Sequence, residues 1–419
     1  MQAARRARAW EVHVARVSHR GRGPSGYTAS IVSLRSYLAV LLAGVGLLVA
    51  AEGSAVAYPQ WQLTSGSVRC NECHYNPGGG GMITSYGRDA VGDQLSTFDG
   101  DGTLLHGAVT PPRWLAVGAD LRGAFVAQGV QDPNGTTVAA FPMQADVGAR
   151  VAIPNGFSIM ATAGVRGITR DPNVDATGQA FQPVSASRFI SREHYVMWQP
   201  EVQGKYVRMG RYYAPYGLRF SEHVLYIRRD LGFDQVEETY NLSGGYTFQK
   251  WELHVTAFAP DFVRHIGSDE KGLAGYYERR LLDDKLALGG QARLADGPGA
   301  TRFMWGGVGK LNIERLRTLF LAEVDFVHIR FDDTAAGWTT QLVGVAGFAV
   351  LPVRGVIVTL LAERNQTDVI VRSAAWTAAT ALVNWFPYPH VELQVMGRLQ
   401  FPAGTDTAKT LFAQLHYFF

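Results

Sequence analysis

The chain ends in LFAQLHYFF, residues 411 to 419, and this stretch decides the fold. Apolar or aromatic residues recur at every second position, and the residues between them include Gln414 and His416. Successive side chains of a β-strand point to opposite faces, so the pattern predicts a strand with one apolar face. By itself it fits a closing strand of a soluble sheet or a strand of a membrane barrel. The apolar face consists of Leu411, Ala413, Leu415, Tyr417 and Phe419.

The same alternation extends upstream as far as Arg113. Between residues 115 and 121, apolar side chains alternate with Gly118 and Asp120. We count about sixteen such runs, each roughly the 9–11 residues with which a tilted strand crosses an outer membrane. Other clear runs are 144–151, 157–169, 252–259, 286–294, 319–329 and 391–399.

Long and short connections alternate between these runs. The short ones are 154–156, 200–204, 249–250, 283–284 and 386–389. Long loops at one end and short turns at the other are typical of bacterial outer-membrane barrels, which the chain also resembles in its terminal Phe419. The sequence therefore predicts an all-β fold, an antiparallel transmembrane β-barrel of about sixteen strands over residues 113–419.

The longest connection, residues 213–237, joins the fifth and sixth predicted strands. It resembles in position the loop that folds into the lumen of sixteen-stranded general porins. We expect it either to narrow the lumen or to lie exposed on the surface. Its candidate lining residues are Tyr213, Tyr216, Arg219, His223, Tyr226, Arg228 and Arg229.

The positive charge of the chain lies in its first segment. Residues 1–57 hold seven arginines and two glutamates, whereas the whole chain has a net charge of only +3. A basic stretch, an apolar core at 37–51 and the small residues Ala55 and Ala57 predict a secretory signal peptide. The core is shorter than the roughly 20 residues that a spanning helix needs. Because the charge belongs to this segment, we expect no nucleic-acid partner.

The next segment, residues 58–112, contains both cysteines of the chain in CNECH, residues 70–74. Cys-x-x-Cys-His is the attachment sequence of c-type haem, with Cys70 and Cys73 as thioether donors and His74 as the proximal iron ligand. A disulfide, a redox dithiol and half of a zinc site are the alternatives. Zinc needs further ligands, and a dithiol of the thioredoxin kind needs a βαβ context. We therefore predict one covalent haem c.

The sixth iron ligand has three candidates. Met82 lies eight residues after His74, across the run Gly78 to Gly81, which can turn the backbone round. His106 is the less favoured candidate, and an open position is the third. Methionine opposite histidine raises the reduction potential.

A signal peptide, one CxxCH and a barrel ending in Phe follow one another in this chain. This order resembles the fused monohaem cytochrome–porins of the bacterial outer membrane, which include outer-membrane iron oxidases. Cys70, Cys73 and His74 match the family's haem-binding residues, and Pro77 and Gly87 match small features that often follow the motif. The tetraglycine run departs from the family pattern.

The resemblance implies electron transfer through a haem on the periplasmic side or in the barrel lumen. The expected partners are outer-membrane lipid, a periplasmic electron carrier such as a soluble cytochrome, and an extracellular electron donor or acceptor, Fe(II) among them. The alternative is a solute or ion channel in which residues 58–112 act as a plug or redox gate.

Overall fold

The structure is a computed structural model that describes residues 62–65, 70–89, 95–129, 136–166, 189–234, 237–262, 268–332, 337–404 and 406–419. These residues lie in one compact unit, Ala51–Phe419. The predicted signal peptide, 1–57, lies outside the described residues. The helical elements are α2 (Gln62–Ser65), η3 (Cys70–Glu72), α3 (Ser85–Asp89), η5 (Pro154–Gly156), α4 (Tyr226–Arg229), η6 (Glu314–Leu316) and η7 (Arg372–Ala374). Among the described residues, no helix is long and apolar enough to cross a membrane.

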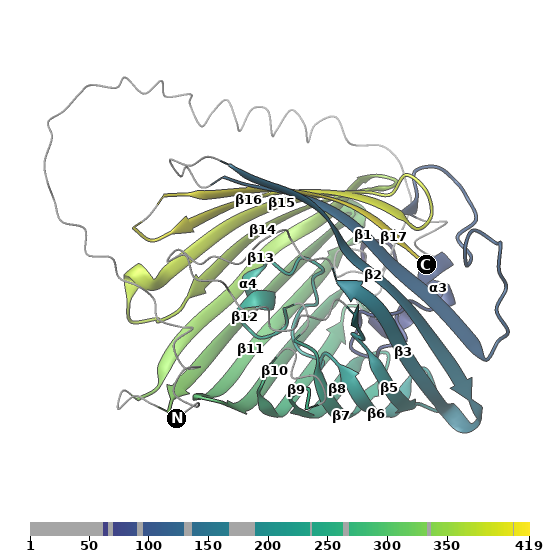
Figure 1. Cartoon of the computed structure of the whole chain (residues 1–419), viewed down its shortest axis with the longest axis horizontal. Coiled ribbons are helices and arrows are strands. Elements are labelled where there is room, and N and C mark those ends of the chain that lie inside the picture. The colour runs from purple at the N-terminus through teal and green to yellow at the C-terminus, as the bar shows by residue number, and fades with distance from the viewer. Residues whose placement is uncertain are drawn as a thin grey trace, which may run out of the picture. The chain divides into compact units, whose positions relative to one another are not determined.

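The rest is built from strands that lie side by side with a common tilt (Figure 1). They are β1 (Leu115–Gly129), β2 (Thr137–Ile153), β3 (Phe157–Arg166), β4 (Phe189–Ile190), β5 (His194–Trp198), β6 (Gly204–Tyr212), β7 (Thr239–Thr247), β8 (Trp251–Ala259), β9 (Lys271–Leu281), β10 (Leu286–Gly297), β11 (Ala300–Ile313), β12 (Thr318–Phe331), β13 (Thr339–Val353), β14 (Val356–Gln366), β15 (Ala375–Trp385), β16 (Val391–Pro402) and β17 (Ala408–Phe418).

The sheet closes on itself. Each strand pairs antiparallel with its neighbours in chain order, and β17 pairs with β1 to complete the circle. Both β4 and β5 pair with β3, so they are two pieces of one interrupted strand. The wall therefore has sixteen strands, since the two pieces count as one of the seventeen. At the seam, the N–H groups of Ala119 and Phe419 each donate to the other residue's carbonyl, at 3.0 and 3.1 Å. The predicted fold class is confirmed.

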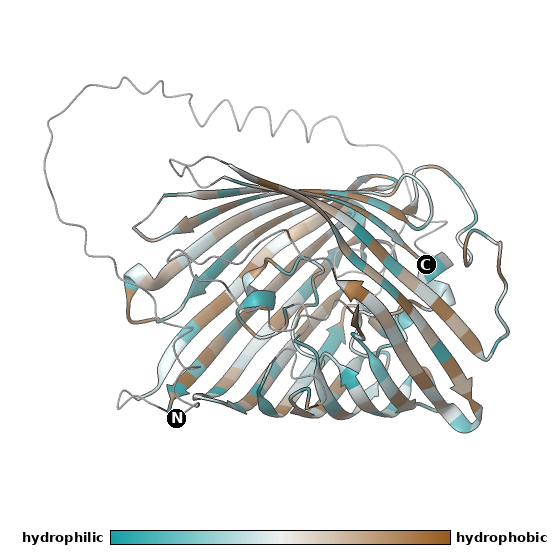
Figure 2. Ribbon diagram, viewed as in Figure 1, coloured by the Kyte–Doolittle hydropathy of each residue, from teal (hydrophilic) through white to brown (hydrophobic). Residues whose placement is uncertain are grey.

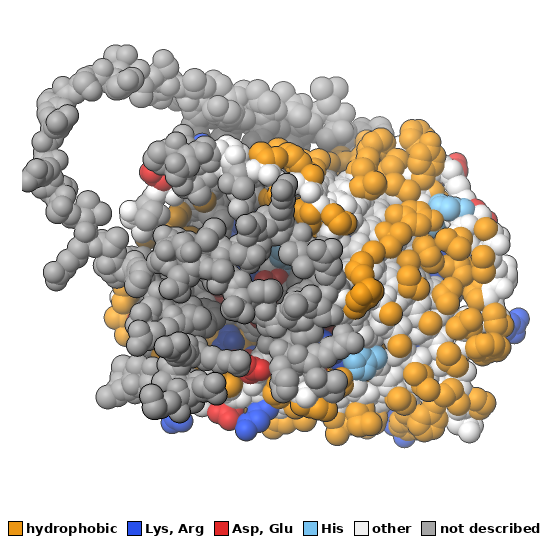
Figure 3. All heavy atoms as spheres, viewed as in Figure 1, with side chains coloured by type: hydrophobic (Ala, Val, Ile, Leu, Met, Phe, Trp, Pro, Cys, Tyr) orange, Lys and Arg blue, Asp and Glu red, His pale blue; other side chains and the backbone are white. Residues whose placement is uncertain are grey.

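The wall is apolar outside and polar inside, the reverse of a soluble protein. In β8, Leu253 and Val255 are exposed, whereas Glu252, His254 and Thr256 between them are buried. Figure 2 shows hydrophobic and hydrophilic residues interspersed along the strands, and Figure 3 shows hydrophobic side chains gathered over the strands at the right of the view. Soluble proteins rarely expose apolar surface this large, and a barrel in lipid requires it.

Exposed aromatic side chains mark both ends of this apolar surface. At one end, Tyr246, Phe248 and Trp251 cluster around the turn between β7 and β8, with the Phe248 and Trp251 ring centres 4.9 Å apart. At the other end, Trp338 and Trp376 are about half exposed, at 52% and 41%. Girdles of this kind lie at the two interfaces between lipid and water.

The two ends of the barrel differ in their connections. One end carries only short connections, including the predicted turns at 154–156, 249–250 and 283–284, and we call it the short-turn end. The opposite end carries the long loops. One connection there departs from the predicted alternation, because only residues 298–299 separate β10 from β11.

The longest connection crosses the lumen, and we call its residues 213–234 the inward loop. It joins β6 to β7, the fifth and sixth strands of the wall. The Leu218 N–H donates to Glu323 Oε2 at 2.6 Å, and the Tyr226 N–H donates to Glu363 Oε2 at 2.8 Å. Because these carboxylates belong to β12 and β14, the loop reaches the opposite wall, where α4 packs on β13 and β14 (Figure 1). The alternative of an exposed surface loop was wrong.

Candidate haem-attachment site

Residues 70–74 form one tight helical turn. The N–H groups of Cys73 and His74 both donate to the Cys70 carbonyl, at 3.3 and 3.2 Å. Residues three and four positions apart in such a turn share a face, so both thiols and the imidazole point to one side. All three residues line the same cavity. The structure thus brings together the three residues that the motif singled out.

The glycine run turns the chain back towards this motif. Gly79, Gly80 and Gly81 have φ values of 79°, 74° and 66°, in the left-handed region that glycine adopts most readily. His74 then pairs antiparallel with Ile83, and the Thr84 N–H donates to the Cys73 carbonyl at 2.8 Å. The tetraglycine run, which the resemblance left without a role, therefore closes a hairpin, residues 74–83.

Two glycines also let neighbouring segments approach the cysteines closely. A Cβ added at Gly79 would lie 2.9 Å from Cys70 Cβ. A Cβ added at Gly87, in α3, would lie 2.5 Å from the Cys73 carbonyl oxygen. The small residue at position 87 therefore allows α3 to pack directly on the motif.

The two distal-ligand candidates lie in different places. In the hairpin, Met82 faces Tyr75 across the ladder, and both pack in a cluster with Met160, Tyr195 and Tyr206 on the barrel wall. Because side chains alternate along such a ladder, Met82 lies on the opposite face from His74. Met82 nevertheless lines the same cavity as His74, and iron ligation by Met82 stays a prediction.

His106 is not brought to the cavity. It lies on an exposed turn with a φ of 56°, where its Nε2 is 3.2 Å from the Tyr417 hydroxyl and its ring centre is 5.2 Å from that of His390. Residues 74 and 106 thus occupy separate sites in the structure.

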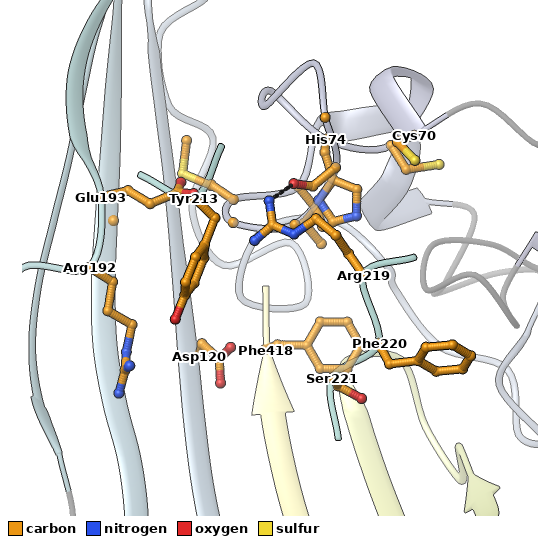
Figure 4. A pocket seen from close by; sticks show the side chains of 18 of the residues that line it. Cys70, His74, Asp120, Arg192, Glu193, Tyr213, Arg219, Phe220, Ser221 and Phe418 are labelled. Atoms are coloured by element: carbon orange, nitrogen blue, oxygen red, sulfur yellow. Dashed lines mark hydrogen bonds between the residues drawn. The ribbon is translucent and has the colours of Figure 1, made fainter. Parts of the chain in front are cut away.

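The motif opens on a cavity of about 280 Å³ inside the barrel. One side is the 70–83 segment, a second is the inward loop, and the rest is the wall, including Asp120, Glu193 and Phe418 (Figure 4). Arg219 of the inward loop donates to the Gly79 carbonyl at 2.7 Å, the bond drawn in Figure 4. The hairpin and the inward loop therefore enclose the cavity together.

The environment keeps both thiols protonated at neutral pH. Burial raises the pKa of the Cys70 thiol to about 11, with the charge of Lys310 opposing the rise. Burial also raises the pKa of Cys73. A raised thiol pKa disfavours a reactive redox dithiol, which needs the thiolate form.

The wall beside Cys70 carries buried charges that compensate one another. Lys310 Nζ lies 2.7 Å from Glu278 Oε2, and Arg280 pairs with both Glu278 and Glu252. A buried ion pair is tolerated when both charges keep partners. The CNECH motif therefore lies against a part of the wall whose buried charges are paired with opposite charges.

The N-terminal segment is held at the short-turn end. Asn71 Nδ2 donates to the carbonyl of Val202, in the turn between β5 and β6, at 3.3 Å. Further along, the N–H groups of Thr97 and Phe98 donate to the carbonyls of residues 386 and 387, at 2.8 and 2.9 Å. The segment thus covers the lumen from the side of the short turns.

These residues fit a c-type haem in donor chemistry. Cys70 and Cys73 would form the two thioethers, and His74 would ligate the iron. Within the described ranges, no cluster of three or more His, Cys, Asp or Glu side chains is arranged to hold a metal ion on its own.

Comparison with known proteins identifies the barrel. No family profile and no curated protein sequence matches the chain. Among solved structures, the outer-membrane-expressed OmpT of Vibrio cholerae is 9% identical, with a TM-score of 0.56, covering 74% of this chain and 100% of its own. OprB of Pseudomonas putida is 10% identical, with a TM-score of 0.53, covering 73% and 94%.

The barrel has the fold of bacterial outer-membrane porins. An anion-selective porin from Comamonas acidovorans shares this fold at 11% identity, with a TM-score of 0.51 and coverage of 73% of this chain and 99% of its own. The predicted barrel, residues 113–419, makes up a share of the chain similar to the 73–74% that these structures cover. At such identities the likeness concerns the fold alone, and the cavity residues need their own argument.

Proposed function

We propose that this porin-fold protein spans a bacterial outer membrane and transfers electrons through a single c-type haem attached to Cys70 and Cys73. The observation that carries the proposal is the position of the CNECH turn, inside the lumen with both thiols and His74 on one cavity. A haem iron supplies one-electron chemistry between Fe(III) and Fe(II).

The residues around the cavity have separable roles in this proposal. His74 ligates the iron, and the two cysteines fix the position of the ring. The hairpin and the inward loop limit the access of water, since Arg219 joins them through the Gly79 carbonyl. Met82 packs in a cluster on the wall and also lines the cavity.

The two ends of the barrel suggest which partner meets which side. Outer-membrane barrels carry short turns on the periplasmic side and long loops outside the cell. The motif lies at the short-turn end, so a periplasmic carrier such as a soluble cytochrome would approach it from there. An extracellular donor or acceptor, with Fe(II) as one candidate, would reach the cavity past the inward loop.

A channel for solutes or ions is the second candidate, and the fold favours it. Porins of known structure share the barrel, and the N-terminal segment would then act as a plug. The two functions differ in one requirement, because only electron transfer needs the covalent group.

The test is the double variant Cys70→Ala and Cys73→Ala in the full chain. Haem staining after denaturing electrophoresis should be complete for the parent and absent for the variant. In liposomes that enclose ferricyanide, with Fe(II) outside, ferricyanide reduction should fall to the rate of empty liposomes. The barrel should remain folded in both proteins, as shown by faster migration of unboiled samples.

Equal reduction rates in the parent and the double variant would refute electron transfer through the haem. A parent without covalent haem but with stepwise conductance in planar bilayers would support the channel instead.

A further inference from the structure

Five cationic side chains of the described residues line the cavity, and three of them have carboxylate partners. Arg122 pairs with Asp120 at 2.6 Å, Arg192 with Asp146 at 2.7 Å, and Lys310 with Glu278 at 2.7 Å. Arg219 and Arg228 of the inward loop are the other two. Neither makes an ion pair with a described carboxylate. In this they differ from the other three cations of the cavity, each of which has a carboxylate within ion-pair distance.

Both arginines are fixed in place by backbone carbonyls. Arg219 donates through one terminal nitrogen to Gly79, and Arg228 donates through Nε to Phe233 at 2.7 Å and through Nη1 to Phe220 at 2.6 Å. Both guanidinium groups also lie near the Tyr213 ring, at 5.2 and 5.5 Å from its centre. Each guanidinium group has further nitrogens that make none of these bonds, and both side chains line the cavity.

Holding two cations this close together costs free energy. Burial and the charge of Arg228 lower the pKa of Arg219, the direction expected when like charges are near, and the charge of Glu193 opposes this shift. Glu193 also lines the cavity, but its Oε1 accepts a bond from Asn76 and it forms no ion pair with either arginine. An anion bound in the cavity near both guanidinium groups would offset the repulsion.

Other arginines show that contact with tyrosine alone does not mark a ligand site. Arg208 and Arg150 also lie over tyrosine rings, at 3.6 Å from Tyr212 and 4.6 Å from Tyr75. Neither of them lines the cavity. Arg219 and Arg228 combine proximity to a tyrosine ring with a place in the lining of the cavity.

We propose that Arg219 and Arg228 form a carboxylate-binding site in the cavity, preorganised by Tyr213 and by the carbonyls of the hairpin and the loop. Guanidinium groups bind carboxylates through short, charge-assisted hydrogen bonds. The carboxylate has two possible sources, the propionates of a haem attached at Cys70 and Cys73 or a soluble carboxylate in the lumen. The first source rests on the proposed function, and the second does not.

The first arm of the test uses the full-length protein with its haem. Arg219→Gln and Arg228→Gln should each lower the reduction potential, because each removes a positive charge near the iron. They should also introduce a pH dependence of the potential near neutrality, because a propionate without its arginine regains a higher pKa. Arg229→Gln is the matched control, since Arg229 is an exposed residue of the same loop paired with Asp230.

The second arm uses the haem-free Cys70→Ala and Cys73→Ala chain with citrate as the probe in calorimetry. A pH-dependent potential in the first arm, absent from the control, assigns the site to the haem propionates. Citrate binding that Arg219→Gln abolishes, with an unchanged potential profile, assigns it to soluble carboxylates. If the parent carries no haem, the proposed function fails and the citrate arm alone decides. The carboxylate site would be refuted if the potential showed no pH-dependent change and citrate binding did not depend on Arg219.

Discussion

The barrel wall and the chain that it encloses are stabilised in different ways. Continuous antiparallel ladders hold the wall, and the seam between β1 and β17 alone pairs ten residues of each strand. The CNECH hairpin has one isolated β-bridge, between His74 and Ile83, and a few hydrogen bonds to turns and to the inward loop. The wall should therefore fold without the enclosed parts, and the enclosed parts should depend on the wall.

The largest expected effect comes from a charge placed on the outer face of the barrel wall. Val255, at the middle of β8, is 54% exposed on the apolar surface. Val255→Lys should destabilise the barrel by about 2–4 kcal/mol, because it places a charge near the centre of the lipid. Guanidinium unfolding in lipid vesicles measures the change.

Val369→Lys is the control, because Val369 lies outside the strands between β14 and β15. Equal loss of stability in the two variants would contradict a membrane position for the exposed face of β8.

A smaller effect is expected from a substitution that disturbs the CNECH motif and leaves the barrel wall folded. Gly87→Ala places a Cβ against the Cys73 carbonyl and should cost about 1–3 kcal/mol locally through overpacking. We expect a lower fraction of haem-stained protein with an unchanged shift between unboiled and boiled samples. Gly123→Ala in β1 is the control, since nothing lies within 4 Å of the Cβ it would add. Full haem attachment in Gly87→Ala would show that α3 need not pack on the motif.

The inward loop should loosen when one anchor is removed. The Tyr216 hydroxyl donates to Asp325 Oδ1 at 2.8 Å, and Gln291 donates to Asp325 and Glu323 at 3.1 and 3.2 Å. Tyr216→Phe should cost about 1–3 kcal/mol, because a buried carboxylate loses a donor. Trypsin should then cut the loop faster in the folded barrel. Tyr246→Phe, on the outer surface, should leave the cutting rate unchanged, and equal rates in all three proteins would exclude this anchor.

The smallest expected effect is a pH dependence of the same loop. Burial raises the pKa of Glu237, beside the loop, to about 7, with the Asp234 N–H opposing the rise and Arg302 and Glu270 also nearby. The resulting stabilisation is complete below the ordinary carboxyl pKa of about 4.5 and is lost as pH rises through about 7. Amide exchange of the loop should therefore be faster at pH 8 than at pH 5, after correction for intrinsic rates. Glu237→Gln should remove most of this difference, and a difference that persists would assign it to other groups.

The sequence predicts the wall well because each strand shows its own alternation of apolar and polar side chains. Strands such as β8 and β16 lie where the alternation of side chains indicated, since each strand must face lipid on one side and the lumen on the other. The short turns at 154–156 and 283–284 and the place of the inward loop follow from the same periodicity. The CNECH turn also groups its own three residues, because their spacing is that of a helical turn.

The enclosed contacts were not predictable in this way. Glu323 and Asp325 bind the inward loop from a strand more than a hundred residues away, and sequence spacing carries no signal for such a pair. The face on which Met82 lies depends on where the hairpin begins to pair, which the glycine run alone does not define.

The seam between the first and last strands has a consequence for the hairpin that the barrel encloses. Phe419 exchanges hydrogen bonds with Ala119, so the circle is completed by pairing the two strands of the sheet that lie farthest apart in the chain. The CNECH segment precedes β1 in the chain. A Cβ at Gly118 would lie 2.7 Å from the Phe419 carbonyl and 3.0 Å from Met82 Cγ, so the hairpin lies against the seam itself. Closing the seam therefore also completes the surface on which the hairpin packs.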